Sequence, residues 1–359
     1  MSKSHFKLVI ILFFILVSPF LLKGETPKEE QHEFDVKEMI MHHIKDMHSF
    51  PIISYNKDGE DVEIAIPLPV ILFSEGKLYI FMSSAFDHGK KVVTKGNKNF
   101  VLYHERIYET NPEGEIIFNE EWHPDNKKPL DLSVTRNVFA MWFSAFLLIL
   151  IFVRVARRYK TILKKPTGIQ SLVEPLVLFV RDDIANELIG KEKAGRYMSF
   201  LMTVFFFIWI NNLIGVIPFF PGGSNLTGNI SVTFVLAVFT FLITNFNGTK
   251  TYWRHILAPP GIPIWVSFIL VPIEIIGIFT KPFALMVRLF ANITAGHIII
   301  LSMASLIFIF SNMAASLPVS FLLQFIMLLL ELLVGFLQAF IFTLLSALFI
   351  GMAVHNEEH

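Results

Sequence analysis

The chain has 359 residues, of which 53% are hydrophobic and only 17% are charged. A soluble protein carries about 25% charged residues, so this composition is typical of a membrane protein. The 30 Lys and Arg residues balance the 30 Asp and Glu residues, which argues against a nucleic-acid-binding protein because such proteins carry a basic surface. The sequence has no cysteine, which excludes disulfides, thiol catalysis and Cys-based metal sites.

Residues 1–24 have the pattern of a secretory signal peptide. Lys3 and Lys7 precede an apolar run that ends near Gly24, in the order expected of such a peptide. Leu22 is too large for a good cleavage site, so an uncleaved membrane anchor is the alternative. In both cases Glu25 and the residues after it are expected outside the cytoplasm.

Residues 25–135 are polar and predict a small extracytoplasmic α+β domain. Residues 34–50 have the periodicity of an amphipathic helix. Turn signals then separate short strand-like runs, which favours an antiparallel sheet. The expected strands are 61–66, 70–73, 77–83, 99–109 and 115–119. His42, His43 and His48 lack the i, i+4 spacing of a metal site on a helix, so we interpret them as solvated surface.

Apolar runs after residue 135 predict about five membrane spans. They cover residues 137–153, 197–217, 229–246, 264–310 and 319–354. A basic cluster that begins at Arg154 follows the first span, and such clusters mark the cytoplasmic side. This agrees with an exported N-terminus and predicts a cytoplasmic C-terminus. Residues 168–193 alternate apolar and charged groups at helical spacing, which predicts a helix on the cytoplasmic membrane surface.

The last two apolar runs are unusually long. The run 264–310 is interrupted at Lys281-Pro282, so either two spans meet there or proline kinks one helix. A helix over residues 319–354 would measure about 54 Å, whereas the hydrocarbon core of a membrane is about 30 Å thick. Such a helix must tilt or project from the membrane. An ordinary span with a short extension is the alternative. Residues 311–318 predict the turn between them. The predicted fold class is an all-α polytopic membrane protein whose last two tilted helices form a hairpin, with a small N-terminal β-rich ectodomain.

The segment 283–300 carries polar residues inside an apolar run that is predicted to span the membrane. Arg288, Asn292 and His297 lie inside it. A charge in hydrocarbon costs at least about 2.5 kcal/mol, so such a residue usually serves an ion path, a charged partner or a voltage sensor. Arg288 does not shed its proton in a protein and is therefore a fixed cation.

Residues equally distant from the turn of a helical hairpin lie level with each other. This places His297 near Glu331 and Arg288 near Gln338, in two layers about 10–14 Å apart; Asn292 shares the face of Arg288. A histidine beside a carboxylate in a membrane suits a proton relay, and a buried polar clasp is the alternative. Arg288 favours the relay, because it needs an anion from elsewhere, for which a carboxylate on a partner subunit is the natural candidate.

Two motifs in this region carry a family resemblance. MVRLFANITAGH (286–297) and LLELLVGFLQAFIFTLL (329–345) resemble subunit a of F-type ATP synthases, the stator of the proton channel. WINNLIGVIPF (209–219) and PIEIIGIFTKP (272–282) are similar to two further segments of that family, and the resemblance covers about residues 130–359. The chain departs from some members in having His297 and Glu331 in the reversed order and Gly215 in place of an acid.

The resemblance implies a non-catalytic subunit of the bacterial inner membrane that translocates protons. Its partners would be a rotating ring of c subunits, peripheral-stalk b subunits and the rest of the ATP synthase, and no cofactor or metal is expected. Arg288 would attract each passing c-ring carboxylate, displace its proton and block direct leakage between the half-channels, and Glu274 would serve the cytoplasmic half-channel. The residues expected to line the outer half-channel are Asn212, Asn292, His297, Glu331 and Gln338.

Three other functions compete with this one. A secondary transporter would need internal repeats, and repeated halves are absent from the sequence. The stator of another ion-driven motor should lack the motif from Arg288 to His297. Helices that merely anchor an ectodomain gain nothing from buried charge. The chain also has no G-x-x-x-x-G-K-[ST] phosphate-binding loop, so any nucleotide chemistry belongs to other subunits.

Overall fold

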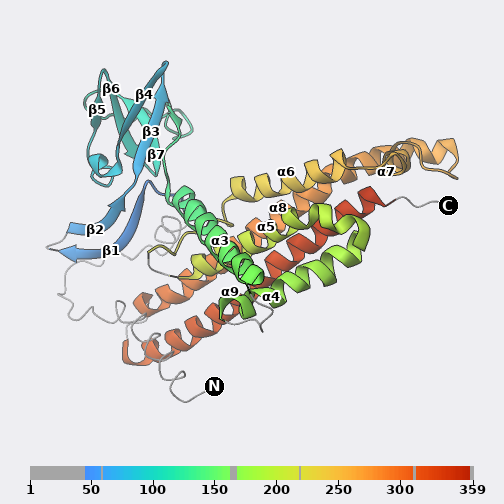
Figure 1. Cartoon of the computed structure of the whole chain (residues 1–359). Coiled ribbons are helices and arrows are strands. Elements are labelled where there is room, and N and C mark those ends of the chain that lie inside the picture. Colours follow the sequence, from blue (N-terminus) through green and yellow to red (C-terminus); the bar gives the residue numbers. More distant parts are fainter. Residues whose placement is uncertain (1–44, 58–59, 162–167, 218–219, 310–312, 356–359) are drawn as a thin grey trace, which may run out of the picture. The chain divides into compact units, whose positions relative to one another are not determined.

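The computed structural model describes residues 45–57, 60–161, 168–217, 220–309 and 313–355 (Figure 1). The predicted fold class is confirmed, because a region of small β-sheets precedes a set of long apolar helices. Within this described part, four helices are long and apolar enough to span a membrane, and a pair bent by 100° makes up to five. The expected signal peptide, the first part of the expected helix 34–50, His42 and His43 lie outside the described residues.

Three small antiparallel sheets make up the N-terminal region. Their strand orders are β1-β2, β4-β3-β8 and β5-β6-β7. The strands are β1 (Ser49–Lys57), β2 (Glu60–Pro67), β3 (Pro69–Ser74), β4 (Lys77–Met82), β5 (Val93–Lys95), β6 (Lys98–Tyr103), β7 (Arg106–Thr110) and β8 (Leu130–Asp131). Alternate residues of the second and third sheets, such as Leu72, Phe81 and Phe100, pack into one apolar core.

Three expectations for this region are wrong. Residues 45–48 are not helical and β1 begins at Ser49, so the predicted helix does not continue to residue 50. His48 is buried rather than solvated, and its Nε2 lies 2.8 Å from Asp131 Oδ2. The contact of His48 with Asp131, which is 83 residues away, outweighs the helical periodicity of the local sequence. Residues 115–119 form a single bridge, from Phe118 to Pro124, instead of a strand.

The expected strand over residues 99–109 is a hairpin of two strands. β6 and β7 are joined at His104 and Glu105, which have φ angles of 48° and 64°. Residues with positive φ turn the chain tightly enough for adjacent antiparallel pairing, and neither residue is a glycine that would have signalled the turn.

Helices account for most of the chain after residue 135. They are α3 (Arg136–Thr161), α4 (Ile169–Phe179), the π-helical segment η3 (Val180–Asn186), α5 (Lys191–Val216), α6 (Ile230–Phe246), α7 (Lys250–Leu257), α8 (Ile264–Ile309) and α9 (Met313–Val354). The helix expected over residues 168–193 is present as α4 and η3, which follow each other without a break, but it ends before Gly190, whose φ is 89°, and α5 begins at Lys191.

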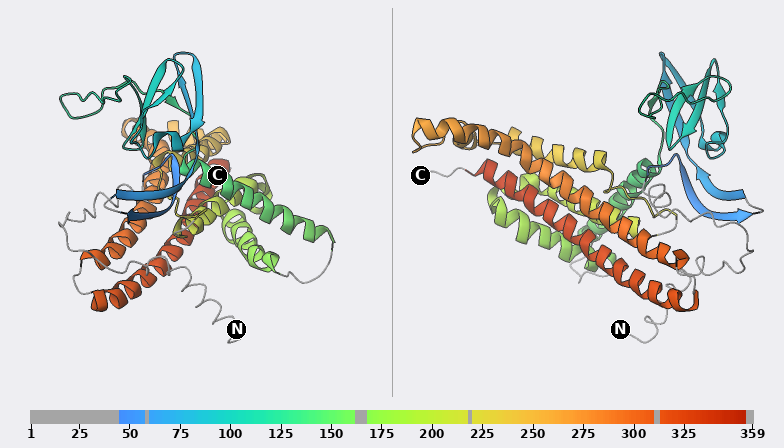
Figure 2. Two further views of the ribbon diagram at one scale, coloured as in Figure 1. Left: turned by 90° about the vertical axis from the view of Figure 1, so that its left-hand side faces the viewer. Right: turned by 180° about the vertical axis from the view of Figure 1, so that it is seen from behind.

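The last two helices run side by side as a hairpin (Figure 2). α8 is one helix of 46 residues that passes through Pro272 and Pro282, and α9 has 42 residues. At 1.5 Å per residue both measure more than about 60 Å, twice the hydrocarbon thickness. Because α9 begins at Met313, the helices take in most of the segment expected to be a turn.

α5 packs against α9 and α8 to form the apolar centre of the helical part. Fully buried side chains of α5, such as Leu201, Phe205 and Ile208, belong to one core with Leu289 of α8 and Ile350 of α9. This packing fixes the three helices that carry most of the candidate site.

Candidate functional site

The centre of the site is a histidine and a glutamate on facing helices. His297 of α8 has its Nε2 3.6 Å from Oε1 of Glu331 on α9, and both side chains are largely buried. This is the pair that equal distance from the hairpin turn predicts. Gly296, next to His297 on α8, also lies against Glu331, because a Cβ at that position would be 3.4 Å from Glu331 Oε1, an ordinary van der Waals distance.

The carboxyl group of Glu331 is held without a fixed hydrogen bond. Neither of its oxygens has a hydrogen-bond partner among the described residues, and the residue is only 8% exposed. Buried polar atoms in proteins are ordinarily hydrogen-bonded. The carboxyl group of Glu331 therefore faces the imidazole of His297 with no hydrogen bond from the described residues to hold it in place.

α5 closes the site beside His297. A Cβ at Gly215 would lie 3.6 Å from His297 Nε2 and 3.1 Å from the backbone oxygen of Ser224. The imidazole therefore lies against the backbone of α5, in space that a side chain at residue 215 would take. An acidic side chain at this position would contact the imidazole directly.

Asn212 joins three parts of the chain. Its Nδ2 donates to the backbone oxygen of Gly335 on α9 at 3.1 Å, and its Oδ1 accepts from the hydroxyl of Thr227. A Cβ at Gly335 would lie 3.0 Å from Asn212 Cβ, so the glycine permits this crossing. Asn212 thereby fixes α5 against α9 one turn away from Glu331.

Arg288 and Asn292 lie on an open face of α8. Both are exposed, and neither forms a hydrogen bond or ion pair with any residue that the structure describes. The expected neighbour of Arg288, Gln338, is buried on α9. No hydrogen bond joins the two within the described residues, so their contact stays a prediction. Small side chains continue the exposed face, namely Ala284, Ala291 and Ala295.

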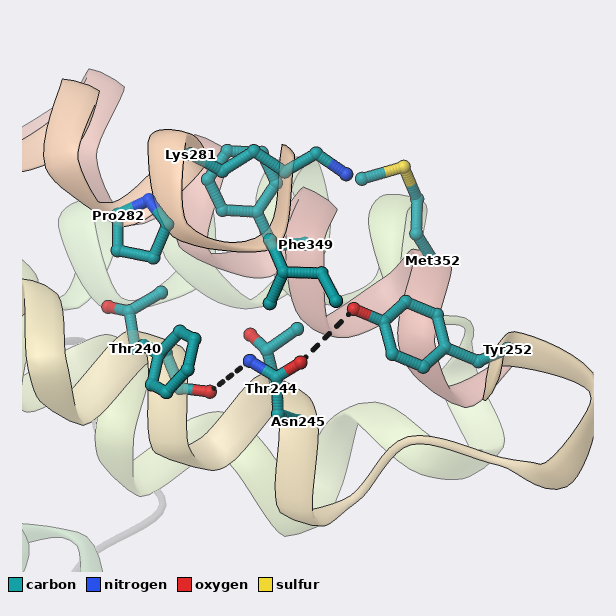
Figure 3. Close-up of a pocket in the computed structure, with 10 residues that line it drawn as sticks. Thr240, Thr244, Asn245, Tyr252, Lys281, Pro282, Phe349 and Met352 are labelled. Carbon is teal, nitrogen blue, oxygen red and sulfur yellow. Dashed lines mark hydrogen bonds between the residues drawn. The ribbon is translucent and has the colours of Figure 1, made fainter. Parts of the chain in front are cut away.

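A second polar cluster surrounds a pocket between α6, α7, α8 and α9 (Figure 3). The Tyr252 hydroxyl donates to Asn245 Oδ1 at 3.3 Å, and Lys281 Nζ lies 5.9 Å from the centre of the Phe349 ring. Glu274, partly exposed on α8, acts electrostatically on Tyr252. Glu274 thus acts on this cluster without lining the pocket, and it precedes Arg288 on α8, whereas His297 follows Arg288.

Sequence reasoning missed the polar residues of the loop 220–228. Ser224 and Thr227 are buried, at 2% and 1% exposure, and both contact the site. Neither is charged, so the charge pattern that identified Arg288 and Glu331 gives no signal here. The only sequence signal is the run of small polar residues and glycines between two apolar spans.

Comparison with known proteins divides the chain into the same two regions. Residues 138–351 match the family described as ATP synthase A chain, and residues 39–132 match a domain of unknown function. The chain is 48% identical over 236 residues to ATP synthase subunit a of Chloroherpeton thalassium, a match that covers 64% of this chain and 69% of that protein. It is 46% identical over 254 residues to ATP synthase subunit a of Chlorobium phaeobacteroides strain BS1, a match that covers 67% of this chain and 73% of that protein. It is 44% identical over 239 residues to ATP synthase subunit a of Myxococcus xanthus, a match that covers 64% of this chain and 77% of that protein.

Proposed function

Because the chain belongs to the ATP synthase A chain family, we propose that it is the proton-conducting stator subunit in the membrane sector of an ATP synthase. It would lie in the bacterial inner membrane, with its N-terminal region outside the cytoplasm and its C-terminus inside. Two half-channels would meet at a rotating ring of c subunits, and b subunits would hold the stator in place. Nucleotide chemistry would take place on other subunits.

The observation that carries this proposal is the pair of His297 and Glu331. The 3.6 Å between Nε2 and Oε1 exceeds the usual hydrogen-bond range, and Glu331 has no hydrogen bond to the described residues. A clasp that only held the hairpin would be a formed hydrogen bond. A buried carboxyl group that faces an imidazole and has no hydrogen bond to the described residues fits a relay better. We assign this pair to the outer half-channel, with Asn212, Asn292 and Gln338 beside it.

The exposed cation on α8 supports a partner that carries an acid. Arg288 lies on an open face of a helix that spans the membrane by its composition, and a charge facing lipid is costly. The exposed alanines at 284, 291 and 295 would let another helix approach closely. A c-subunit helix with a carboxylate would satisfy the guanidinium group as each copy passes.

Arg288 also separates the two polar clusters. It lies seven residues after Lys281 and nine before His297, which corresponds to about 10 Å and about 14 Å along the helix axis. We propose that Glu274 and the pocket beside Tyr252 belong to the cytoplasmic half-channel. A fixed positive charge between the two half-channels would oppose direct passage of protons.

ATP-driven proton pumping by inverted membrane vesicles tests the function. Arg288→Ala should abolish acidification while the c ring still co-purifies with the complex. Arg181→Ala is the matched control, because this exposed arginine pairs only with the neighbouring Asp182 in the described structure, and it should pump normally. Normal pumping by an assembled Arg288→Ala complex would overturn the mechanism.

The two alternatives give different results in the same preparation. A secondary transporter would purify without a c ring and would not acidify vesicles on addition of ATP. The stator of another motor would purify with a different rotor. The motif around Arg288 and the family match favour the ATP synthase.

A further inference from the structure

The N-terminal region is hydrogen-bonded to the start of the first spanning helix. Asp46 Oδ1 accepts from the backbone N–H of Asn137 at 3.0 Å, and Asp46 Oδ2 accepts from the hydroxyl of Thr135 at 2.8 Å. The backbone oxygen of Met47 accepts from the N–H of Arg136 at 2.9 Å. Two consecutive residues before β1 therefore fix the beginning of α3.

The same junction holds the loop 220–228. Ser224 Oγ donates to Asn137 Oδ1 at 2.6 Å, and both residues are buried. The ring of Phe50 lies 5.1 Å from the ring of Phe220 and 5.5 Å from the guanidinium carbon of Arg136. The loop is thus bound on one side by residues of β1 and α3.

On its other side the loop contacts the candidate site. Gly223 donates its N–H to the backbone oxygen of Ile214 at 3.2 Å, and the hydroxyl of Thr227 donates to Asn212 Oδ1. The hydroxyl of Thr294, three residues before His297, donates to the backbone oxygen of Gly228 at 3.4 Å. A series of contacts therefore leads from Asp46 through the loop to α5 and to α8, the helix that carries His297.

A buried cation marks the junction. Arg136 is 4% exposed, and its Nε and Nη1 have no hydrogen-bond partner within the described part of the chain. Burying a charged group is costly unless it is paired, and a simple connection between two regions has no need of one. Asp46 lies close enough to act on it electrostatically, so the junction brings an acidic and a basic side chain together beside the loop.

We propose that the N-terminal region is a positioning element of the outer half-channel, with Asp46, Thr135 and Asn137 as the positioning residues. They fix Ser224 and the loop, and the loop fixes Asn212 and the backbone against which His297 lies. This inference rests on the proposed function. It gives a role to residues 39–132, which match a domain of unknown function.

Passive proton flux through the membrane sector tests the inference. The assembled complex is placed in vesicles, the nucleotide-hydrolysing subunits are removed, and flux is measured while the proton concentration is varied on each side. Ser224→Ala removes its hydrogen bond to Asn137. Thr135→Val removes the bond to Asp46 together with the longer one, 3.4 Å, that the Thr135 hydroxyl accepts from the Val138 N–H. We expect the flux driven by protons on the outer side to fall three- to tenfold, which is about the worth of one such hydrogen bond. The way in which the flux depends on the inner proton concentration should not change.

Two matched variants separate positioning from general damage. Thr135→Ser keeps the hydroxyl donor and should restore the flux lost in Thr135→Val. Asp87→Ala removes an exposed carboxylate of the same region that pairs with Lys91, away from the loop, and should conduct normally. Equal losses in Asp87→Ala, failure of Thr135→Ser to recover, or a loss on both sides alike would overturn the inference.

The outcome is distinguishable from failure of the proposed function. If Arg288→Ala abolishes pumping while assembled Thr135→Val and Ser224→Ala complexes conduct normally, the function stands and the positioning role is wrong. If Arg288→Ala pumps normally, the proposed function itself fails, and the positioning role fails with it.

Discussion

His297 Nε2 of α8 and Glu331 Oε1 of α9 lie 3.6 Å apart, between two long helices that pack side by side. The distance is too long for a firm hydrogen bond and short enough for a small side-chain rotation to form one. Because each residue belongs to a different helix, their separation depends on how α8 packs against α9. The pair thus links the geometry of the hairpin to any chemistry that the two groups perform.

Exchanging the two residues tests whether the pair acts as a unit. His297→Glu leaves two carboxyl groups side by side, and Glu331→His leaves two imidazoles, so each single variant should lose at least about tenfold in passive proton flux. The double variant keeps one of each group in contact and should recover most of that loss. Interaction energies of this size are typical of contacting residues. The measurement is flux in the three variants at equal c-ring content; a double variant as slow as the singles would show that each position requires its own residue.

Gly215→Ala tests the contact between α5 and His297. The added Cβ would lie 3.1 Å from the backbone oxygen of Ser224, so the loop must shift by a few tenths of an ångström, and it would touch His297 Nε2 at an ordinary contact distance of 3.6 Å. We expect reduced proton flux with normal assembly. Gly195→Ala on the same helix, where no atom lies within 4 Å of the new Cβ, is the control. Equal flux in both variants would mean that the fit at residue 215 does not matter.

Gly351→Ala should impair folding rather than conduction. A Cβ there would lie 2.1 Å from the backbone oxygen of Leu188, which cannot move aside as a side-chain end can, and overpacking of this kind costs about 1–3 kcal/mol. The amount of complex extracted from membranes should fall. Gly277→Ala on α8 meets no atom within 4 Å and should leave the yield unchanged. A normal yield for Gly351→Ala would show that α9 and the segment before Gly190 can separate without harm.

The spans and the central pair could be predicted from sequence because few physical rules decide them. Apolar runs of sufficient length predict helices, and residues equally distant from a turn lie level, which is how His297 was matched to Glu331. The contacts of Asp46 with Asn137 and of His48 with Asp131 join residues 91 and 83 positions apart. No local pattern encodes such contacts, and this is why the predicted helix over residues 34–50 was extended too far.

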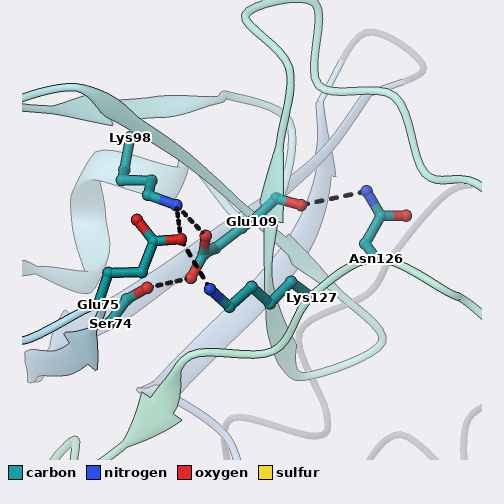
Figure 4. Close-up of polar contacts among 6 residues, drawn as sticks. All are labelled: Ser74, Glu75, Lys98, Glu109, Asn126 and Lys127. Atoms are coloured by element: carbon teal, nitrogen blue, oxygen red, sulfur yellow. Dashed lines mark hydrogen bonds and ion pairs between the residues drawn. The ribbon is translucent and has the colours of Figure 1, made fainter.

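A cluster of charges in the N-terminal region gives a prediction about pH (Figure 4). Lys127 Nζ and Lys98 Nζ lie 2.8 Å and 2.9 Å from Glu75 Oε1, and Lys98 Nζ also lies 2.7 Å from Glu109 Oε2. The hydrogen bonds from Lys127 and Lys98 lower the pKa of Glu75 to about 2. Because Glu75 is half exposed, solvent screens these interactions and the effect on stability is small.

The sign of the effect follows from proton binding. An unfolded glutamate has a pKa of about 4.3, so the unfolded state of this chain binds a proton at Glu75 more readily than the folded state. The stabilisation is therefore complete above about pH 4.5 and is lost as the pH falls towards 2. Glu75→Gln should make the stability of β4 and β6 less dependent on pH in this window. Hydrogen exchange of the β4 and β6 amides in the full chain, corrected for intrinsic exchange rates, measures this pH dependence. Glu113→Gln, which changes an exposed glutamate, is the control. An unchanged pH dependence in Glu75→Gln would show that the lysines do not stabilise the ionised carboxylate.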